Sequence, residues 1–291
     1  MNDNKISSQW MIVMSYLGGA LIFFGIAIFI HLNWSFLNGF MRVFVTLGVA
    51  IAAYFIALIC AFDKNYRVIS NAFFIIAGFI LPVGLYVSVD LAGGDLSISS
   101  LRAMLSALCL GVFFISACYM RQTILVLFSI LFGSLFYFDL AEWILYSSTG
   151  WIGDINTYVV MVLGVSYLLL GRYLESTLHR TLTGLLYLLG AFFVLGTSYS
   201  LGGSFWGDAN IHFWKIMTAF LILLTLFSAI PLKSKALLYV GALFLIMYVA
   251  DISSDLAKIL GDRGWPLFLV LMGLALMLTG FVVVRVQKKI R

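Results

Sequence analysis

The segment from Leu17 to Arg42, LGGALIFFGIAIFIHLNWSFLNGFMR, decides the fold class of this chain. Residues 12–30 include no charged side chain, and as a helix such a run spans the roughly 30 Å hydrocarbon core of a bilayer. The run ends at His31, Asn33 and Trp34, polar and aromatic residues of the kind found at headgroup level. We therefore predict a first transmembrane helix whose orientation constrains every later one.

The composition indicates a membrane protein. Hydrophobic residues make up 63% of the 291 positions and charged residues 10%, with a mean hydropathy of +1.11. A soluble domain would carry about 25% charged residues. The net charge of +5 forms no basic patch with interleaved aromatic residues, so nucleic acid is not an expected partner. The 3 cysteines lie in apolar runs and imply no disulfide framework. The first apolar run is too long for a signal-peptide core, so we expect it to be retained.

Apolar runs of spanning length recur along the whole chain. The expected helices cover residues 12–30, 43–62, 72–91, 101–120, 124–145, 157–174, 182–201, 216–230, 236–251 and 266–284. These ten spans predict an all-α, polytopic transmembrane helix bundle. No loop is long enough for a soluble domain, so residues 1–291 are expected to form a single transmembrane domain with short cytoplasmic termini.

The placement of charge supports this topology. With a cytoplasmic N-terminus, 12 of the 17 Lys and Arg residues fall on the inner side, whereas nine of the 12 acidic residues fall on the outer side. Short loops rich in Lys and Arg stay cytoplasmic, so both termini are predicted to be cytoplasmic. Six of the 7 Trp residues fall at the outer interface. They form either an aromatic belt or an outward-facing rim that contacts a lipid, a glycan or a partner protein.

The eight middle helices resemble a repeat of four helical hairpins, at residues 42–92, 101–145, 157–201 and 215–252. Each hairpin has a short basic inner turn and is followed by a Gly- and Asp-containing outer loop. The period of about 50–60 residues is typical of stacked helical hairpins. Similar hydropathy alone is the alternative explanation.

The first and last helices carry a recognisable pattern. Gly18-Gly19-Ala20-Leu21, Gly25-Ile26, Asn33-Trp34 and Arg42 resemble the opening of the bacterial membrane proteins grouped as domain of unknown function 2157. The ending, Gly273-Leu274-Ala275-Leu276 followed by Arg285 and a basic tail, is similar to theirs, while the middle of the chain matches only as apolar helices. The resemblance implies a location in the bacterial cytoplasmic (inner) membrane. It implies no activity, because that family is uncharacterised.

Ionisable residues at the outer ends of the predicted spans are the candidates for a functional site. They are Asp90, Asp139, Glu142, Asp251, Arg42, Arg102 and Lys215. Charges at membrane depth are costly, so opposite charges at similar depth should pair. We expect Asp90 and Asp139 to face the bundle interior beside Arg42, Arg102 or another outer basic residue. Such pairs either fasten helix ends or line a polar cleft that opens to the outside.

Pro82 is the only proline in the middle of a predicted span and lies between Gly78 and Gly84. Because proline removes an amide donor and strains the preceding turn, this position is a candidate helix break. Interrupted spans mark substrate sites in transporters, although a packing kink is the alternative.

No catalytic constellation is found in the sequence. The 3 histidines are scattered, and no nucleophile elbow, zinc-protease motif or P-loop occurs. We therefore expect no enzyme activity, no metal and no cofactor. The favoured function is a small-molecule, ion or lipid permease with an outward-facing polar cleft. The alternative is a non-catalytic scaffold or a subunit of an envelope complex. The expected partners are the lipid bilayer and either a membrane protein or a second copy of the chain.

Overall fold

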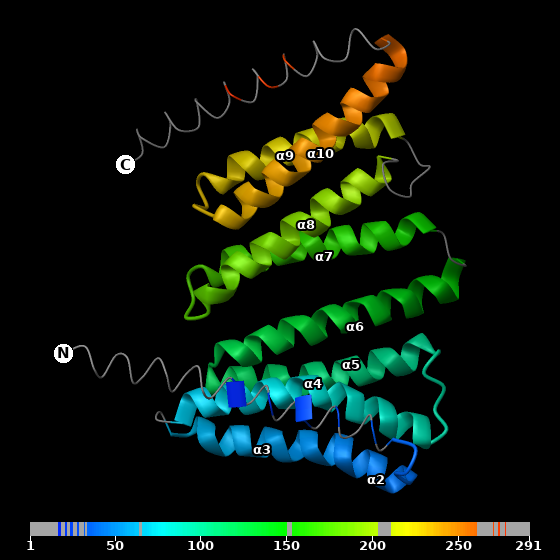
Figure 1. The fold of residues 1–291 in the computed structure, drawn as a ribbon, viewed down its shortest axis with the longest axis vertical. Coiled ribbons are helices and arrows are strands. Elements are labelled where there is room, and N and C mark those ends of the chain that lie inside the picture. The colour runs from blue at the N-terminus through cyan, green and yellow to red at the C-terminus, as the bar shows by residue number, and fades with distance from the viewer. Residues whose placement is uncertain are drawn as a thin grey trace, which may run out of the picture. The chain divides into compact units, whose positions relative to one another are not determined.

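The computed structural model describes residues 17, 18, 21, 24, 25, 28, 32, 34–63, 66–149, 153–202, 211–260, 270, 273 and 277. All regular secondary structure in these residues is helical, which confirms the all-α prediction (Figure 1). The elements are α2 (Gly39–Val43), the π-helical turn η1 (Phe44–Gly48), α3 (Val49–Ala61), α4 (Arg67–Leu91), α5 (Ser99–Met120), α6 (Thr123–Thr149), α7 (Gly153–Leu174), the 3-10 turn η3 (Arg180–Leu182), α8 (Thr183–Leu201), α9 (Ile211–Ala229) and α10 (Lys235–Leu260). The predicted spans 12–30 and 266–284 lie almost entirely outside the described residues.

Seven helical segments among the described residues are long and apolar enough to cross a membrane. They are Gly39–Ala61, Arg67–Leu91, Ser99–Met120, Thr123–Leu145, Ile155–Leu174, Arg180–Leu201 and Lys235–Ser253. The apolar part of α9, Phe213–Ala229, is shorter. These segments support a transmembrane protein, and the count of ten spans stays a prediction.

Several helices are longer than their apolar runs. α4 begins at Arg67 rather than at residue 72, and α10 continues to Leu260, beyond Asp251. Hydropathy marks the part of a helix that suits a bilayer, whereas backbone hydrogen bonds continue into the polar turns on either side. The predicted boundaries therefore differ most where a polar turn extends the helix.

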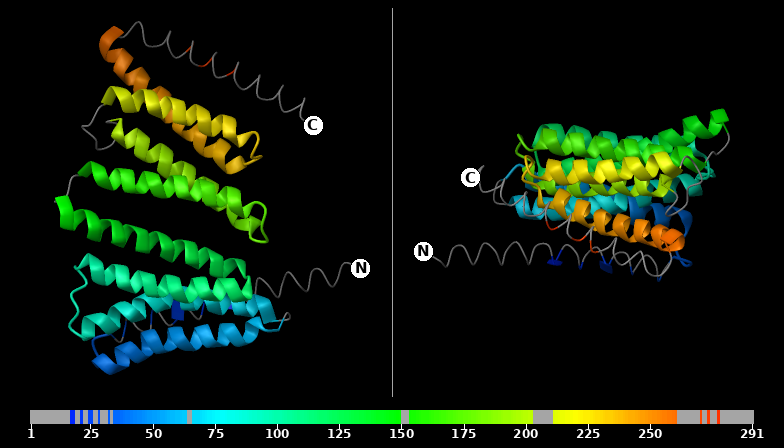
Figure 2. Two further views of the ribbon diagram at one scale, coloured as in Figure 1. Left: turned by 180° about the vertical axis from the view of Figure 1, so that it is seen from behind. Right: turned by 90° about the horizontal axis from the view of Figure 1, so that it is seen from above.

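Two compact units make up the chain, Met1–Gly150 and Trp151–Arg291. In the first unit, α3 packs along α4 and α5 packs along α6, and α4 also contacts both α5 and α6. In the second unit, α7 packs along α8 and α9 along α10, and α8 contacts both α9 and α10. Figures 1 and 2 show that helices adjacent in sequence run side by side as hairpins within each unit. Whether the hairpins are structural repeats stays a prediction.

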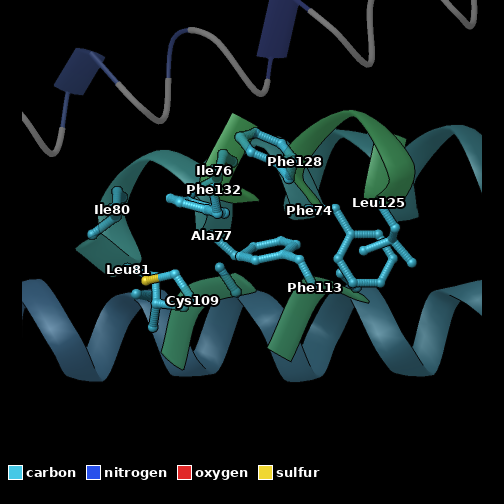
Figure 3. Close-up of a cluster of buried hydrophobic side chains, with 13 residues drawn as sticks. Phe74, Ile76, Ala77, Ile80, Leu81, Cys109, Phe113, Leu125, Phe128 and Phe132 are labelled. Atoms are coloured by element: carbon cyan, nitrogen blue, oxygen red, sulfur yellow. The ribbon is translucent and has the colours of Figure 1, made fainter. Parts of the chain in front are cut away.

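The core of the first unit is aromatic (Figure 3). Phe113 of α5 packs against two rings of α6, tilted to Phe128 with 5.2 Å between centroids and stacked on Phe132 with 5.3 Å. Tyr54 of α3 meets Phe113 edge to face at 6.0 Å, and its hydroxyl is hydrogen-bonded to Ser116. These contacts join α3, α5 and α6 through large buried rings, and the polar end of Tyr54 is satisfied inside the unit.

Glycines set the closest helix approaches. In the second unit, a β-carbon at Gly190 of α8 would lie 2.9 Å from the carbonyl oxygen of Gly164 in α7. In the first unit, a β-carbon at Gly84 of α4 would lie 2.6 Å from the backbone nitrogen and Cα of Leu47. Leu47 belongs to the π-helical turn η1, so α4 meets that irregular turn backbone to backbone. Small residues allow such contacts between transmembrane helices.

Gly84→Ala is expected to lower the free energy of unfolding by about 1–3 kcal/mol, because the new methyl group cannot enter the backbone of η1 without displacing it. Thermal unfolding of the purified protein in detergent measures the effect. Gly111→Ala in α5 is the matched control, because a β-carbon there has no neighbour within 4 Å. An unchanged melting temperature for Gly84→Ala would contradict the close approach.

Candidate functional site

Three of the predicted site residues meet at one ion cluster between α5 and α6. Nη2 of Arg102 lies 2.5 Å from Oε2 of Glu142, and Nε of Arg102 lies 3.5 Å from Oδ1 of Asp139. The side chains are partly buried, with exposed fractions of 23% for Arg102, 21% for Asp139 and 38% for Glu142. One guanidinium therefore faces two carboxylates, and the cluster carries one surplus negative charge when all three groups are ionised.

Local helix geometry explains why these side chains meet. Arg102 lies in the first turn of α5, which begins at Ser99. Asp139 and Glu142 are three residues apart on α6, so they occupy the same helix face. The close packing of α5 on α6 then brings the Arg102 guanidinium to both carboxylates.

Two residues of this site were not predicted from the sequence. The hydroxyl of Ser106 lies 2.9 Å from Oδ2 of Asp139 and also 3.0 Å from the carbonyl oxygen of Arg102. Its single hydrogen serves one acceptor at a time. Tyr86 of α4 lies within range of an electrostatic interaction with Arg102. The sequence spacing could have identified Ser106, because it lies four residues after Arg102 and therefore on the same helix face. Nothing in the sequence signalled Tyr86.

Arg42 and Asp90 do not join the cluster. Nε of Arg42 donates to the carbonyl oxygen of Leu37 at 3.0 Å, and its guanidinium carbon lies 4.9 Å from the ring centroid of Trp34. Arg42 therefore closes its own turn and makes a cation–π contact. Asp90 is exposed at the end of α4, and among the described residues no side chain forms an ion pair with it. The expected inward, paired position of Asp90 is not found there, because the last turn of α4 presents this side chain outward.

Lys215 and Asp251 lie in the second unit, around Tyr248 of α10. The hydroxyl of Tyr248 donates to the carbonyl oxygen of Lys215 at 3.0 Å, and Lys215 and Asp251 are the charged residues near this phenol. The Lys215 side chain packs on Gly202 at the end of α8, with 3.7 Å between its Cγ and a β-carbon built at Gly202. The seven predicted charges are thus divided between the two units.

Pro82 does not divide its span. α4 is one continuous helix from Arg67 to Leu91 with Pro82 inside it. A transmembrane helix tolerates proline because neighbouring helices and local adjustment compensate for the missing donor. The candidate helix break is therefore a proline within an intact helix, which favours the packing alternative.

No group of three or more His, Cys, Asp or Glu side chains among the described residues is arranged to hold a metal ion. The Arg102 cluster offers different chemistry. Its carboxylates can take up a proton or a small cation, and the guanidinium and the Ser106 hydroxyl hold them in place.

A double-mutant cycle between Arg102→Gln and Glu142→Gln should give a coupling energy of about 1 kcal/mol, because Arg102 is only 23% exposed and Glu142 is partly buried. Unfolding in detergent measures it. The same cycle on Arg172–Glu175, three residues apart in sequence and with a 66% exposed arginine, is the control and should give about 0.3–0.5 kcal/mol. Equal coupling at the two sites would show that the Arg102 cluster is no more than a surface pair.

Comparison of this chain with protein-family models, curated proteins and solved structures gives no match. The resemblance of its first and last helices to domain of unknown function 2157 therefore stays a hypothesis. Any functional conclusion has to come from the residues and geometry described above.

Proposed function

We propose that this protein is a multi-pass membrane permease that binds a small cation or a proton at an outward-facing polar site centred on Asp139. The observation that carries the proposal is the imbalance of the Arg102 cluster. Glu142 takes the nearest guanidinium nitrogen at 2.5 Å, whereas Asp139 lies 3.5 Å from its nearest one. Asp139 is therefore the less neutralised carboxylate and the better acceptor for an arriving positive charge.

The membrane environment strengthens this argument. Ionisable side chains within apolar spans are costly and are commonly retained for ion or proton pathways. A surplus carboxylate is stabilised when a cation or a proton neutralises it. Partial exposure of Asp139 leaves a route for such a charge, and the hydroxyl of Ser106 keeps one oxygen of the carboxylate oriented.

The same proposal includes ten spans arranged as stacked hairpins, with both termini on the cytoplasmic side of a bacterial inner membrane. Seven segments of spanning length, together with the shorter apolar part of α9, support the eight middle spans of this proposal. The excess of Lys and Arg in alternate loops supports the orientation.

Reporter fusions test the orientation. A reporter placed after Arg121, in the turn between α5 and α6, and one placed after Arg291 should both report a cytoplasmic location, because Lys and Arg accumulate in cytoplasmic loops. A fusion after Asp95, between α4 and α5, is the control and should report the opposite side. A periplasmic signal after Arg121 would contradict the topology.

A scaffold or complex subunit is the second candidate, and the same cluster supports it. Arg102, Asp139 and Glu142 compensate one another between only two helices, with Ser106 as a further tie. This arrangement fastens α5 to α6 without any substrate. A scaffold function therefore requires only that the cluster stabilise the fold, and no ion has to move through the protein.

Flux into proteoliposomes distinguishes these functions. Vesicles with a pH-sensitive dye inside and an imposed Na⁺ or K⁺ gradient should show faster proton or cation movement than protein-free vesicles. Asp139→Asn should reduce the flux to the protein-free level, because asparagine keeps the shape of the side chain and cannot carry its charge. Asp95→Asn, at an exposed carboxylate that accepts from the backbone nitrogen of Ser97, should keep wild-type flux.

Two results would contradict the proposed permease function. Wild-type flux in a folded Asp139→Asn variant would remove Asp139 from the pathway. No flux for the wild-type protein with protons, Na⁺ or K⁺ would favour the scaffold.

A further inference from the structure

The hydroxyl of Ser106 in α5 has more acceptors within reach than it has hydrogens to donate. Its oxygen lies 2.9 Å from Oδ2 of Asp139, 3.0 Å from the carbonyl oxygen of Arg102 and 3.1 Å from that of Ala103. A serine hydroxyl carries one hydrogen and two lone pairs, and the hydrogen rotates to suit its partners. The side chain is only 8% exposed, so the protein rather than bulk water supplies these partners.

Ser129 of α6 shows the ordinary arrangement of a buried serine in these helices. It is also 8% exposed, and its hydroxyl donates to the carbonyl oxygen of Leu125 at 2.8 Å, one turn earlier on its own helix. Ser106 has the same kind of bond available, to the carbonyl oxygen of Arg102 four residues earlier. In addition it reaches a carboxylate of the neighbouring helix, so its hydrogen has a choice between two kinds of acceptor.

The charge of Asp139 decides which acceptor receives this hydrogen. While the carboxylate is ionised, a charge-assisted bond from Ser106 to Oδ2 is stronger than a bond to a neutral carbonyl. Once Oδ2 carries a proton it becomes a donor, and the oxygen of Ser106 accepts from it across the same 2.9 Å. The hydrogen of Ser106 then turns to the carbonyl oxygen of Arg102. Both charge states keep the hydroxyl and Oδ2 hydrogen-bonded, and no heavy atom has to move.

We infer that the positive charge taken up at Asp139 is a proton, and that Ser106 is the positioning residue for its uptake and release. This inference rests on the proposed permease function and narrows its substrate. A hydronium ion from the outer side gives its proton to Oδ2, where an O–H bond forms, and leaves as water. Release breaks that O–H bond and hands the proton to a water molecule, while the hydrogen of Ser106 returns to Oδ2.

A metal cation fits the same position less well. Metal ions are held by several oxygen ligands at once, about six for Ca²⁺ or Mg²⁺. Within the part of the chain that the structure describes, no group of three or more His, Cys, Asp or Glu side chains could hold one. The guanidinium of Arg102, 3.5 Å from Oδ1 of Asp139, also repels a metal ion at this carboxylate. A proton is held by one covalent bond and needs no ligand shell.

The charged neighbours of Asp139 keep their charge during this exchange. Arg102 of α5 is not deprotonated in proteins, and Glu142 of α6 holds its ion pair with Arg102 at 2.5 Å. Tyr86 of α4 adds a phenol within electrostatic range of Arg102. Asp139, which has the longer contact with the guanidinium, is therefore the carboxylate whose charge changes.

Flux into proteoliposomes separates a proton from a metal ion. With valinomycin and equal K⁺ on both sides to remove the membrane potential, a pH step should give a faster response of an internal pH-sensitive dye than in protein-free vesicles. Uptake of radioactive sodium and rubidium ions at equal pH should stay at the protein-free level.

Variants of the two serines test the role of Ser106. Ser106→Ala should lower the proton flux about two- to tenfold, because one hydrogen bond between neutral groups shifts an equilibrium by about that factor. Ser106→Thr keeps the hydroxyl and should restore the flux. Ser129→Ala, at an equally buried serine that bonds within its own helix, is the matched control and should keep wild-type flux. Thermal unfolding in detergent checks that each variant is folded.

Infrared difference spectroscopy between alkaline and acidic buffer detects the exchange without any flux measurement. The band of the protonated Asp139 carboxyl group is identified by its absence in Asp139→Asn. Ser106→Ala should move this band to higher wavenumber, because the carboxyl O–H loses its acceptor, and Ser129→Ala should leave it in place.

Four results decide between the inference and the function on which it rests. Sodium or rubidium uptake that depends on Asp139, without proton flux, would overturn the choice of the proton and keep the permease. Wild-type flux and an unmoved carboxyl band in Ser106→Ala would overturn the role of Ser106. Absence of an Asp139 carboxyl band in acidic buffer would overturn proton uptake. No flux of any ion, with a carboxyl band that moves in Ser106→Ala, would support proton uptake and overturn the permease alone.

Discussion

A charge inside an apolar span has to find its counter-charge within the protein, and this requirement governs the α5–α6 hairpin. The side chain of Arg102 is only 23% exposed, so water cannot solvate its guanidinium fully and the carboxylates of α6 supply the counter-charge. The cost of leaving one charge of such a pair without its partner exceeds the benefit of forming the pair. The cluster therefore fixes the register of α5 against α6 more strongly than aliphatic contacts between uniformly apolar helices would. The aromatic stack around Phe113 and Phe128 continues the same contact deeper between these two helices.

Buried hydroxyl groups also need partners, and most of those in these helices find a hydrogen-bond acceptor within their own helix. Ser116, Ser129 and Thr225, among others, donate to the carbonyl four residues earlier, so each helix satisfies its own side chains. This solution needs no partner helix and leaves the apolar surface free for lipid. Tyr187 cannot use this route, because its hydroxyl lies too far from its own backbone, and the charged groups near that hydroxyl are Glu175 and Arg172. Tyrosine hydroxyls therefore depend on groups outside their own turn, as the hydrogen bond between Tyr54 and Ser116 shows.

The helices could be predicted from the sequence because apolar length is a one-dimensional property. The site depends on the direction in which each side chain points, and this was predicted only in part. Opposite charges at similar depth correctly suggested that Arg102 meets Asp139. The apolar residues are distributed almost evenly around α6, so no polar face revealed which helix surface is buried. Each residue is rotated by about 100° around the helix axis from the one before it, so the helix face decides whether a carboxylate is paired or exposed. Asp139 on α6 is paired, whereas Asp90 on α4 is exposed. The contact of Arg42 with Trp34 also escaped prediction, because it needed the geometry of a single turn.

The two ion clusters differ in their charge balance. Around Arg102 there is one guanidinium for two carboxylates, so one negative charge is left without a counter-charge when all three groups are ionised. Around Arg172 one guanidinium faces one carboxylate, so no charge is left over. A proton or a cation would neutralise the surplus carboxylate of the first cluster, whereas the second cluster has none to neutralise. The proposed binding of a positive charge therefore depends on the unequal distances of Glu142 and Asp139 from Arg102, 2.5 Å and 3.5 Å.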